Sequence, residues 1–118
     1  MTIKQYAMRI CTECGMRPQN AGFTYTVEAI ILFYENRSYS TYAITKRLYP
    51  DIAHKYGVSW SAVERGMRHA ISNSRSKHNN SNFIMCAVNF IDYCKEMDEN
   101  EENFQQAKNE IFENLMIN

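Results

Sequence analysis

The chain has 118 residues and a formal net charge of zero, and 45% of its residues are hydrophobic, which excludes a largely disordered protein. Its four Gly and two Pro are too few for the many turns of an all-β sandwich or barrel. No apolar run approaches the roughly 20 residues of a membrane span or resembles a signal peptide. We therefore expect a cytoplasmic protein without a membrane partner, whose four Cys are free thiols.

Apolar residues recur at helical spacing along nearly the whole chain, so we predict an all-α fold. We expect a compact domain of about six helices that contains a helix-turn-helix, followed by an acidic C-terminal helix. Thr2 suits the N-cap of the first helix and Gly15 its C-cap. The first half of the chain is expected to form a helix at 2–14, a loop at 15–22, a helix from 23, an interruption at 36–40 and one or two turns from 44. A helix at 50–56, a helix at 59–74 and a polar loop at 75–80 follow. The chain then continues with a helix opening at 81 or 82, an acidic break at 98–103, and a last helix with an apolar stripe of Phe104, Ala107, Ile111 and Leu115.

The charges are distributed unevenly along the chain. Residues 1–91 contain 11 Lys/Arg and 5 Asp/Glu, a balance of +6, whereas residues 92–118 contain 2 and 8, a balance of −6. The basic excess is concentrated in residues 37–77, which hold 8 basic and 2 acidic residues. A basic stripe is typical of a protein with a polyanionic partner, although a solvated surface with a solubilising tail explains the same charges.

The middle of the chain carries the pattern of a helix-turn-helix. Pro50 suits the first turn of a short helix, and Gly57 ends that helix in a backbone conformation that penalises a Cβ. Ser59 is placed to cap a second, longer helix, while Ser61 and Glu64 form a rival capping box two residues later.

The longer helix, at residues 59–74, has two different faces when it is wound at about 100° per residue. One face is apolar, and the opposite face carries Ser61, Arg65, Arg68, His69 and Ser72, with Glu64 at its edge. Arg side chains can pair with guanine and carboxylates with cytosine in a major groove, which admits such a helix. This pattern predicts binding to double-stranded DNA, with Lys46 and Lys55 able to meet phosphates. The alternative is an ordinary solvated face on which Glu64 and Arg68 form an i,i+4 ion pair.

Three long spaced strings make the sequence recognisable. They are Gly22-Phe23-Thr24-Tyr25-x-Val27-Glu28-Ala29-Ile30, Ile44-Thr45-Lys46-x-Leu48-Tyr49-Pro50-Asp51-Ile52-Ala53-x-Lys55-Tyr56 and Ser61-x-Val63-Glu64-Arg65-x-x-Arg68-His69-Ala70-Ile71. The chain resembles the family of the C-terminal effector domain of stage-zero sporulation protein A, a response regulator that initiates sporulation. The match is strong over about residues 22–74, weaker in the first helix and faint at 81–90, whereas residues 98–118 match nothing known in the family.

The resemblance implies an all-helical, sequence-specific DNA-binding domain that regulates transcription, with the helix at 59–74 in the major groove. It implies that Glu64, Arg65 and Arg68 face the bases, whereas the DNA backbone lies near Ser61, His69 and Lys46. We include the capping Ser59 in the predicted interface. Members of the family also bind neighbouring sites head to tail, so a homodimer or a head-to-tail pair on DNA is expected.

The chain departs from the family pattern at several positions. Ala62 stands where the family usually has an Arg, so a changed or shorter site, or weaker binding, is expected. Gly66 costs about 1 kcal/mol relative to Ala inside a helix. Trp60 replaces a small residue, and we expect it to pack at the helix edge rather than to touch a sugar. Because the chain begins at Met1, we also expect no receiver domain and no phosphorylation-driven dimerisation.

The sequence signals for a metal site, a redox site or an enzyme are weaker than the signal for DNA binding. Cys11 and Cys14 suggest a zinc or redox site, but a tetrahedral zinc site needs four ligands. Cys86 and Cys94 complete such a site only if the first helix meets the helix that opens at 81 or 82. We therefore expect no metal, no cofactor, no small-molecule substrate and no enzymatic activity.

The charge split suggests two parts, a DNA-binding domain at residues 1–97 and an acidic helical tail at residues 98–118. The acidic residues of the tail could lie across the basic face and compete with DNA. A second possible function is a non-enzymatic protein-interaction module or antagonist on the same scaffold, with weak DNA binding.

Overall fold

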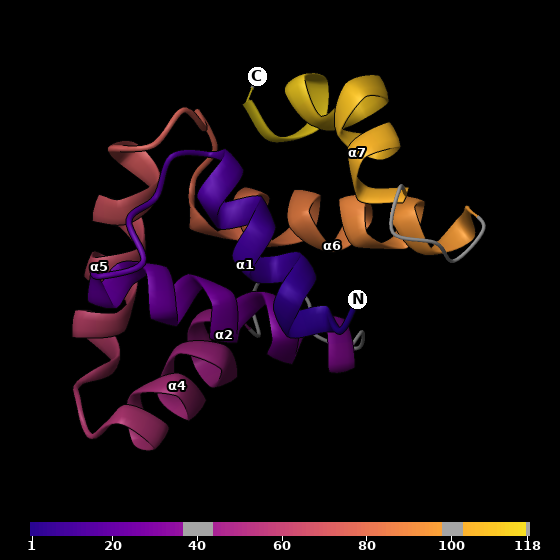
Figure 1. Ribbon diagram of the computed structural model, residues 1–118. Coiled ribbons are helices and arrows are strands. Elements are labelled where there is room, and N and C mark those ends of the chain that lie inside the picture. The colour runs from indigo at the N-terminus through magenta and orange to yellow at the C-terminus, as the bar shows by residue number, and fades with distance from the viewer. Residues whose placement is uncertain (37–43, 98–102, 118) are drawn as a thin grey trace.

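The computed structural model describes residues 1–36, 44–97 and 103–117, and throughout these ranges the regular structure is helical, without a strand (Figure 1). The prediction of an all-α fold is confirmed. Within the described ranges, no helix is long and apolar enough to cross a membrane. The elements are α1 (Ile3–Glu13), α2 (Ala21–Glu35), the π-helical segment η1 (Ile44–Leu48), α4 (Tyr49–Tyr56), α5 (Trp60–Ser72), α6 (Asn80–Glu96), α7 (Asn103–Ala107) and the π-helical segment η2 (Lys108–Ile117).

The beginning of α1 follows the sequence prediction. The hydroxyl of Thr2 accepts the N–H of Gln5 at 3.1 Å, and the Gln5 side chain accepts the N–H of Thr2 at 2.8 Å, which completes a capping box. At the other end the prediction is wrong by one residue, because Cys14 is the C-cap. Gly15 follows it with φ of +92°, a conformation that glycine adopts without strain.

The predicted loop at residues 15–22 is too long, because α2 already begins at Ala21. Gly22 is therefore a helical residue rather than a turn residue. A Cβ on Gly22 would lie 2.2 Å from the carbonyl oxygen of Gly66 and 2.8 Å from the Cβ of Ala70. The glycine is needed because the backbones of α2 and α5 touch where the two helices cross (Figure 1).

Two later boundaries also differ from the prediction. Asn73 is the C-cap of α5, so that helix ends at Ser72 rather than Ser74. The side chain of Asn79 accepts the N–H of Asn82 at 2.9 Å, which starts α6 before the predicted position. The expected interruption at 36–40 and the acidic break at 98–103 lie outside the described residues, apart from their ends at 36 and 103.

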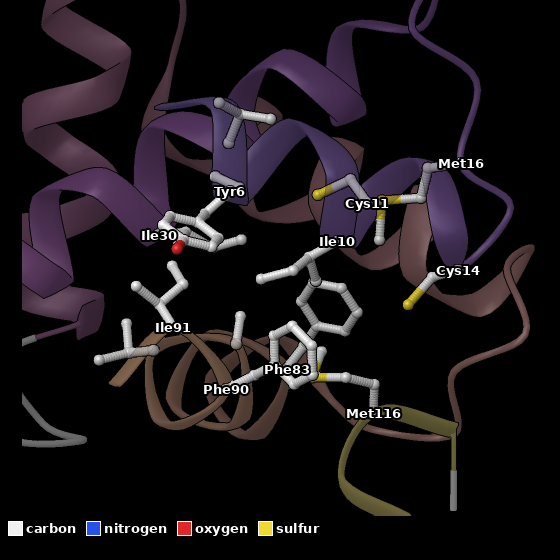
Figure 2. Packing of buried hydrophobic residues seen from close by; sticks show 14 of the residues in the cluster. Tyr6, Ile10, Cys11, Cys14, Met16, Ile30, Phe83, Phe90, Ile91 and Met116 are labelled. Atoms are coloured by element: carbon white, nitrogen blue, oxygen red, sulfur yellow. The ribbon is translucent and has the colours of Figure 1, made fainter. Parts of the chain in front are cut away.

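Two hydrophobic clusters hold the helices together. The larger cluster joins α1, α2 and α6 to the C-terminal elements, and Figure 2 shows Tyr6 and Ile10 of α1 facing Phe83 and Phe90 of α6. The smaller cluster joins α4 and α5 to α2 and α6, and it contains Ala29, Leu48, Tyr49, Ile52, Ala53, Val63, Met67 and Ile84. The helix-turn-helix is thus fixed to the rest of the protein through its inner face.

The C-terminal elements pack on the larger cluster. The ring of Phe90 makes edge contacts with Phe104 and Phe112, with centroid distances of 5.3 and 5.2 Å. Phe112 and Met116 are buried, whereas Ile111 and Leu115, two residues of the expected apolar stripe, are half-buried. The α-helical spacing fails here because η2 is π-helical, and its i→i+5 hydrogen bonds change which positions face the core. The division at residue 98 stays a prediction.

The close crossing of α2 and α5 makes a sharp prediction for stability. We expect Gly22→Ala to lower the free energy of unfolding by about 3 kcal/mol, because its methyl group must displace a backbone carbonyl. Gly66→Ala is the matched control, since its Cβ would meet the Tyr25 ring at 3.2 Å and it gains helix propensity. Its change should stay within about 1 kcal/mol. Chemical denaturation followed by circular dichroism measures the stability of both variants. Equal unfolding midpoints for the two variants would contradict the close backbone contact between α2 and α5.

Candidate nucleic-acid interface

The turn between α4 and α5 is formed by a left-handed glycine and a side-chain cap. Gly57 ends α4 with φ of +67°, and the N–H of Val58 returns to the carbonyl of Ala53 at 3.0 Å. Ser59 then caps α5, its hydroxyl accepting the N–H of Ala62 at 3.1 Å. The predicted cap at Ser59 is confirmed, and the hydroxyl of Ser61 lies beside it at 3.2 Å instead of starting the helix.

α5 separates into the two faces that its sequence predicts. Val63, Met67, Ala70 and Ile71 are buried against the smaller and larger clusters. The opposite face is exposed along its whole length, and it consists of Ser61, Arg65, Arg68, His69 and Ser72. The structure therefore brings five polar side chains onto one accessible surface, which we call the outer face of α5.

One of the two arginines on the outer face of α5 takes part in an ion pair. Nε of Arg68 lies 3.3 Å from a carboxylate oxygen of Glu64, one helical turn earlier, so the ion pair expected from the spacing is present. The Arg68 side chain is nevertheless 63% exposed, and an ion pair this open holds its partners weakly. The ring Nε2 of His69 lies 3.0 Å from the Asn73 amide. The guanidinium groups therefore remain available to a ligand.

The lysines predicted to meet phosphates lie on different elements. Lys46 is exposed on η1, which packs against α2 and α4, so it adjoins the helix-turn-helix through α4. Lys55 is engaged at the end of α4, where its ammonium lies 2.9 Å from a carboxylate oxygen of Glu28. That hydrogen bond raises the pKa of Lys55, and it also draws the side chain toward α2.

A groove of about 300 Å³ runs between the outer face of α5 and the start of α6. Trp60 lines it and is 51% exposed, so the expectation that this indole packs at the helix edge is only half met. Asn80 forms the floor, donating from its amide to the Tyr49 hydroxyl at 3.2 Å and to the Glu64 carbonyl at 3.1 Å. The remaining lining residues are Arg68, Ser72, His78, Asn79 and Ser81.

A second, smaller hollow of about 70 Å³ lies at the C-terminal half of α5. It brings Arg17 and Asn20, from the loop before α2, next to His69 and Asn73. Sequence reasoning missed Arg17, because nothing in the local pattern indicates that a loop so far away in the chain reaches α5. Its positive charge extends the basic surface beyond the helix-turn-helix.

The described acidic residues of the tail are engaged elsewhere. Glu113 pairs with Arg75 at 2.7 Å, and Glu110 accepts a short hydrogen bond from the hydroxyl of Tyr93. The predicted masking by Glu101 and Glu102 falls outside the described residues. In this structure the acidic side chains that can be placed leave the outer face of α5 open.

The cysteines do not resemble a prepared metal site. Burial raises the pKa of Cys14 to about 12 and the pKa of Cys11 well above its ordinary value, so both side chains are buried thiols. Cys94 is buried in the larger cluster, and Cys86 is partly exposed beside it. Among the described residues, no three His, Cys, Asp or Glu side chains gather as a metal site would require.

A short helix, a glycine-ended turn and a capped second helix with an exposed basic face define a helix-turn-helix protein of the DNA-binding class. A family model with the description "Sporulation initiation factor Spo0A C terminal" matches residues 7–111. The chain belongs to this family, which comprises DNA-binding effector domains of a sporulation regulator rather than enzymes. The resemblance drawn from the three sequence strings is confirmed, but the expectation that residues 98–118 match nothing in the family is wrong for residues 98–111.

The capping arrangement predicts how α5 is held at its first turn. We expect Ser59→Ala to lower the free energy of unfolding by about 1 kcal/mol, because it removes the acceptor for the Ala62 N–H. Ser61→Ala is the matched control and should change stability by less than about 0.5 kcal/mol. Urea unfolding of both variants measures the difference. A larger loss for Ser61→Ala would mean that the helix starts at the rival cap.

Proposed function

We propose that the chain is a sequence-specific DNA-binding transcriptional regulator that inserts α5 into the major groove of double-stranded DNA. The observation that carries this proposal is the outer face of α5. Its polar side chains are exposed, its helix is fixed by the close crossing with α2, and its first turn is accessible beyond Gly57. The N-terminal half of such a helix lies nearest the base edges.

The roles of the side chains follow from their chemistry and position. Arg65 and Arg68 can donate two hydrogen bonds to guanine, and Glu64 can accept from cytosine. Ser59, Ser61 and His69 lie along the same helix, where they are suited to phosphate or sugar contacts that fix the register. Lys46 on η1 adds a charge for the backbone of the DNA. No small-molecule substrate is needed for this activity, and pairing of two copies on neighbouring sites would extend the site read.

The ion pair between Arg68 and Glu64 sets a condition on this proposal. To read guanine, Arg68 must leave Glu64, and the carboxylate must then find a cytosine amino group or water. Because the pair is exposed, this exchange costs little. The same carboxylate disfavours a nearby phosphate, so Glu64 contributes more to discrimination than to affinity.

A second candidate is a protein-interaction module on the same scaffold. The half-exposed indole of Trp60 favours it, because tryptophan is enriched in protein interfaces. The two functions differ in their dependence on salt. A DNA-binding surface releases counterions, whereas a mainly apolar protein contact responds weakly to ionic strength.

The decisive experiment measures binding of the full chain to a random-sequence duplex over a range of salt concentrations. We expect log affinity to fall linearly with log salt, with a slope that reflects several phosphate contacts. Selection of bound sequences from a random pool should then yield a preferred site. Absence of binding at low salt would contradict the proposal and favour the protein-interaction module.

The role of Arg68 is tested on the selected site. We expect Arg68→Ala to weaken binding by about 1–3 kcal/mol and to relax the preference at one base position. Lys95→Ala is the control, because it removes one positive charge from an exposed position near the end of α6. It should leave the base preference unchanged. Equal losses for the two variants would show that Arg68 contributes only general charge.

A further inference from the structure

Trp60 occupies an unusual place in the outer part of α5. It is the first residue of the helix and is 51% exposed, the highest fraction among the large hydrophobic residues that the structure describes. Wound at about 100° per residue, Trp60 stands roughly 80° from Arg68 and on the same side as Glu64. It lies about 120° from Ser72, which is at the centre of the outer face, and therefore stands at the border between Glu64 and the buried Met67.

The groove beside α5 gives this indole a defined setting. Trp60, Glu64 and Arg68 line one wall, and the start of α6, with Asn79 and Ser81, lines the other. An apolar ring that is half open to water at the edge of a charged surface is complementary to a partner with both an apolar and a charged part. A sugar–phosphate backbone has both, because the faces of its deoxyribose rings are apolar and each ring is flanked by phosphates.

The position of Trp60 decides which part of the DNA it meets. When a helix enters a major groove, the centre of its exposed face points to the bases and its flanks point to the two walls, which are the sugar–phosphate strands. Trp60 is on a flank and in the first turn, the part of the helix that goes deepest. Arg68, about 80° away around the helix, lies nearer the side that would face the bases.

We propose that Trp60 packs against the apolar face of a deoxyribose of one DNA strand as α5 enters the major groove, with the phosphates that flank this sugar directed away from the Glu64 carboxylate. This inference rests on the proposed function and adds a contact that carries affinity without sequence information. The indole is rigid, with only two rotatable side-chain bonds, so ordering it on DNA has a small entropic cost. The contact loses no charge and releases no counterion.

The chain is well suited to a direct test, because Trp60 is its single tryptophan. The full chain is titrated with a duplex recovered from the selection, while anisotropy of the labelled DNA reports binding and tryptophan emission reports the indole. We expect the emission to change at the same DNA concentration as the anisotropy. The bound protein should also be less sensitive to quenching by acrylamide, because the sugar covers the exposed part of the ring.

Variants separate the apolar contact from a structural or electrostatic one. Trp60→Ala should weaken binding by about 5- to 20-fold, since part of a large apolar surface is no longer covered. Trp60→Phe should recover most of that loss. In both variants the slope of log affinity against log salt should stay unchanged, because no phosphate contact is removed. Met8→Ala, at a 40% exposed hydrophobic position on α1, is the matched control and should bind normally.

Several results would overturn the inference. If anisotropy shows binding while emission and acrylamide quenching stay constant, Trp60 does not touch DNA, and the proposed function survives without it. If Trp60→Ala alters the base preference at one position, the indole contacts a base instead of a sugar. An emission change that depends on protein concentration without DNA would assign the ring to a protein contact. If no duplex binds at all, the proposed function fails and the inference fails with it.

Discussion

The contact between the backbones of α2 and α5 is the constraint on which the rest of the structure depends. Gly22 has no Cβ, and the carbonyl of Gly66 occupies the space that a Cβ would take. This close approach fixes the rotation of α5 about its own axis, because Met67 and Ala70 must then face inward. The exposure of Arg65 and the other polar residues is thus a consequence of a crossing on the opposite side of the helix.

Polar contacts fix the second relation that the interface needs, between α5 and the start of α6. The buried amide of Asn80 donates to the hydroxyl of Tyr49 on α4 and to the carbonyl of Glu64 on α5. One side chain therefore connects three helices at the floor of the groove. Buried amides with such paired donors resist displacement, because each lost hydrogen bond would leave a group without a partner in a dry environment.

Much of the fold was predictable from the sequence wherever the cause is local. The caps at Thr2 and Ser59 and the left-handed Gly57 depend only on neighbouring residues, and the sequence pattern placed them correctly. Gly22 was misinterpreted as a turn residue, since its true neighbour is Gly66, far away in the chain. The positions of other features, such as Arg17 beside His69, the π-helical register of η2 and the half-open Trp60, depend on tertiary packing that no local pattern encodes.

The hydrogen bond between His78 and the carbonyl of Leu115, at 2.8 Å, connects two parts of the protein with different tasks. His78 also lines the groove beside α5, and Arg75, three residues earlier, is held by Glu113. The C-terminal segment therefore acts as a brace for the loop that leads into α6. Displacement of the C-terminal segment would therefore remove the contact that holds His78 at one rim of the groove.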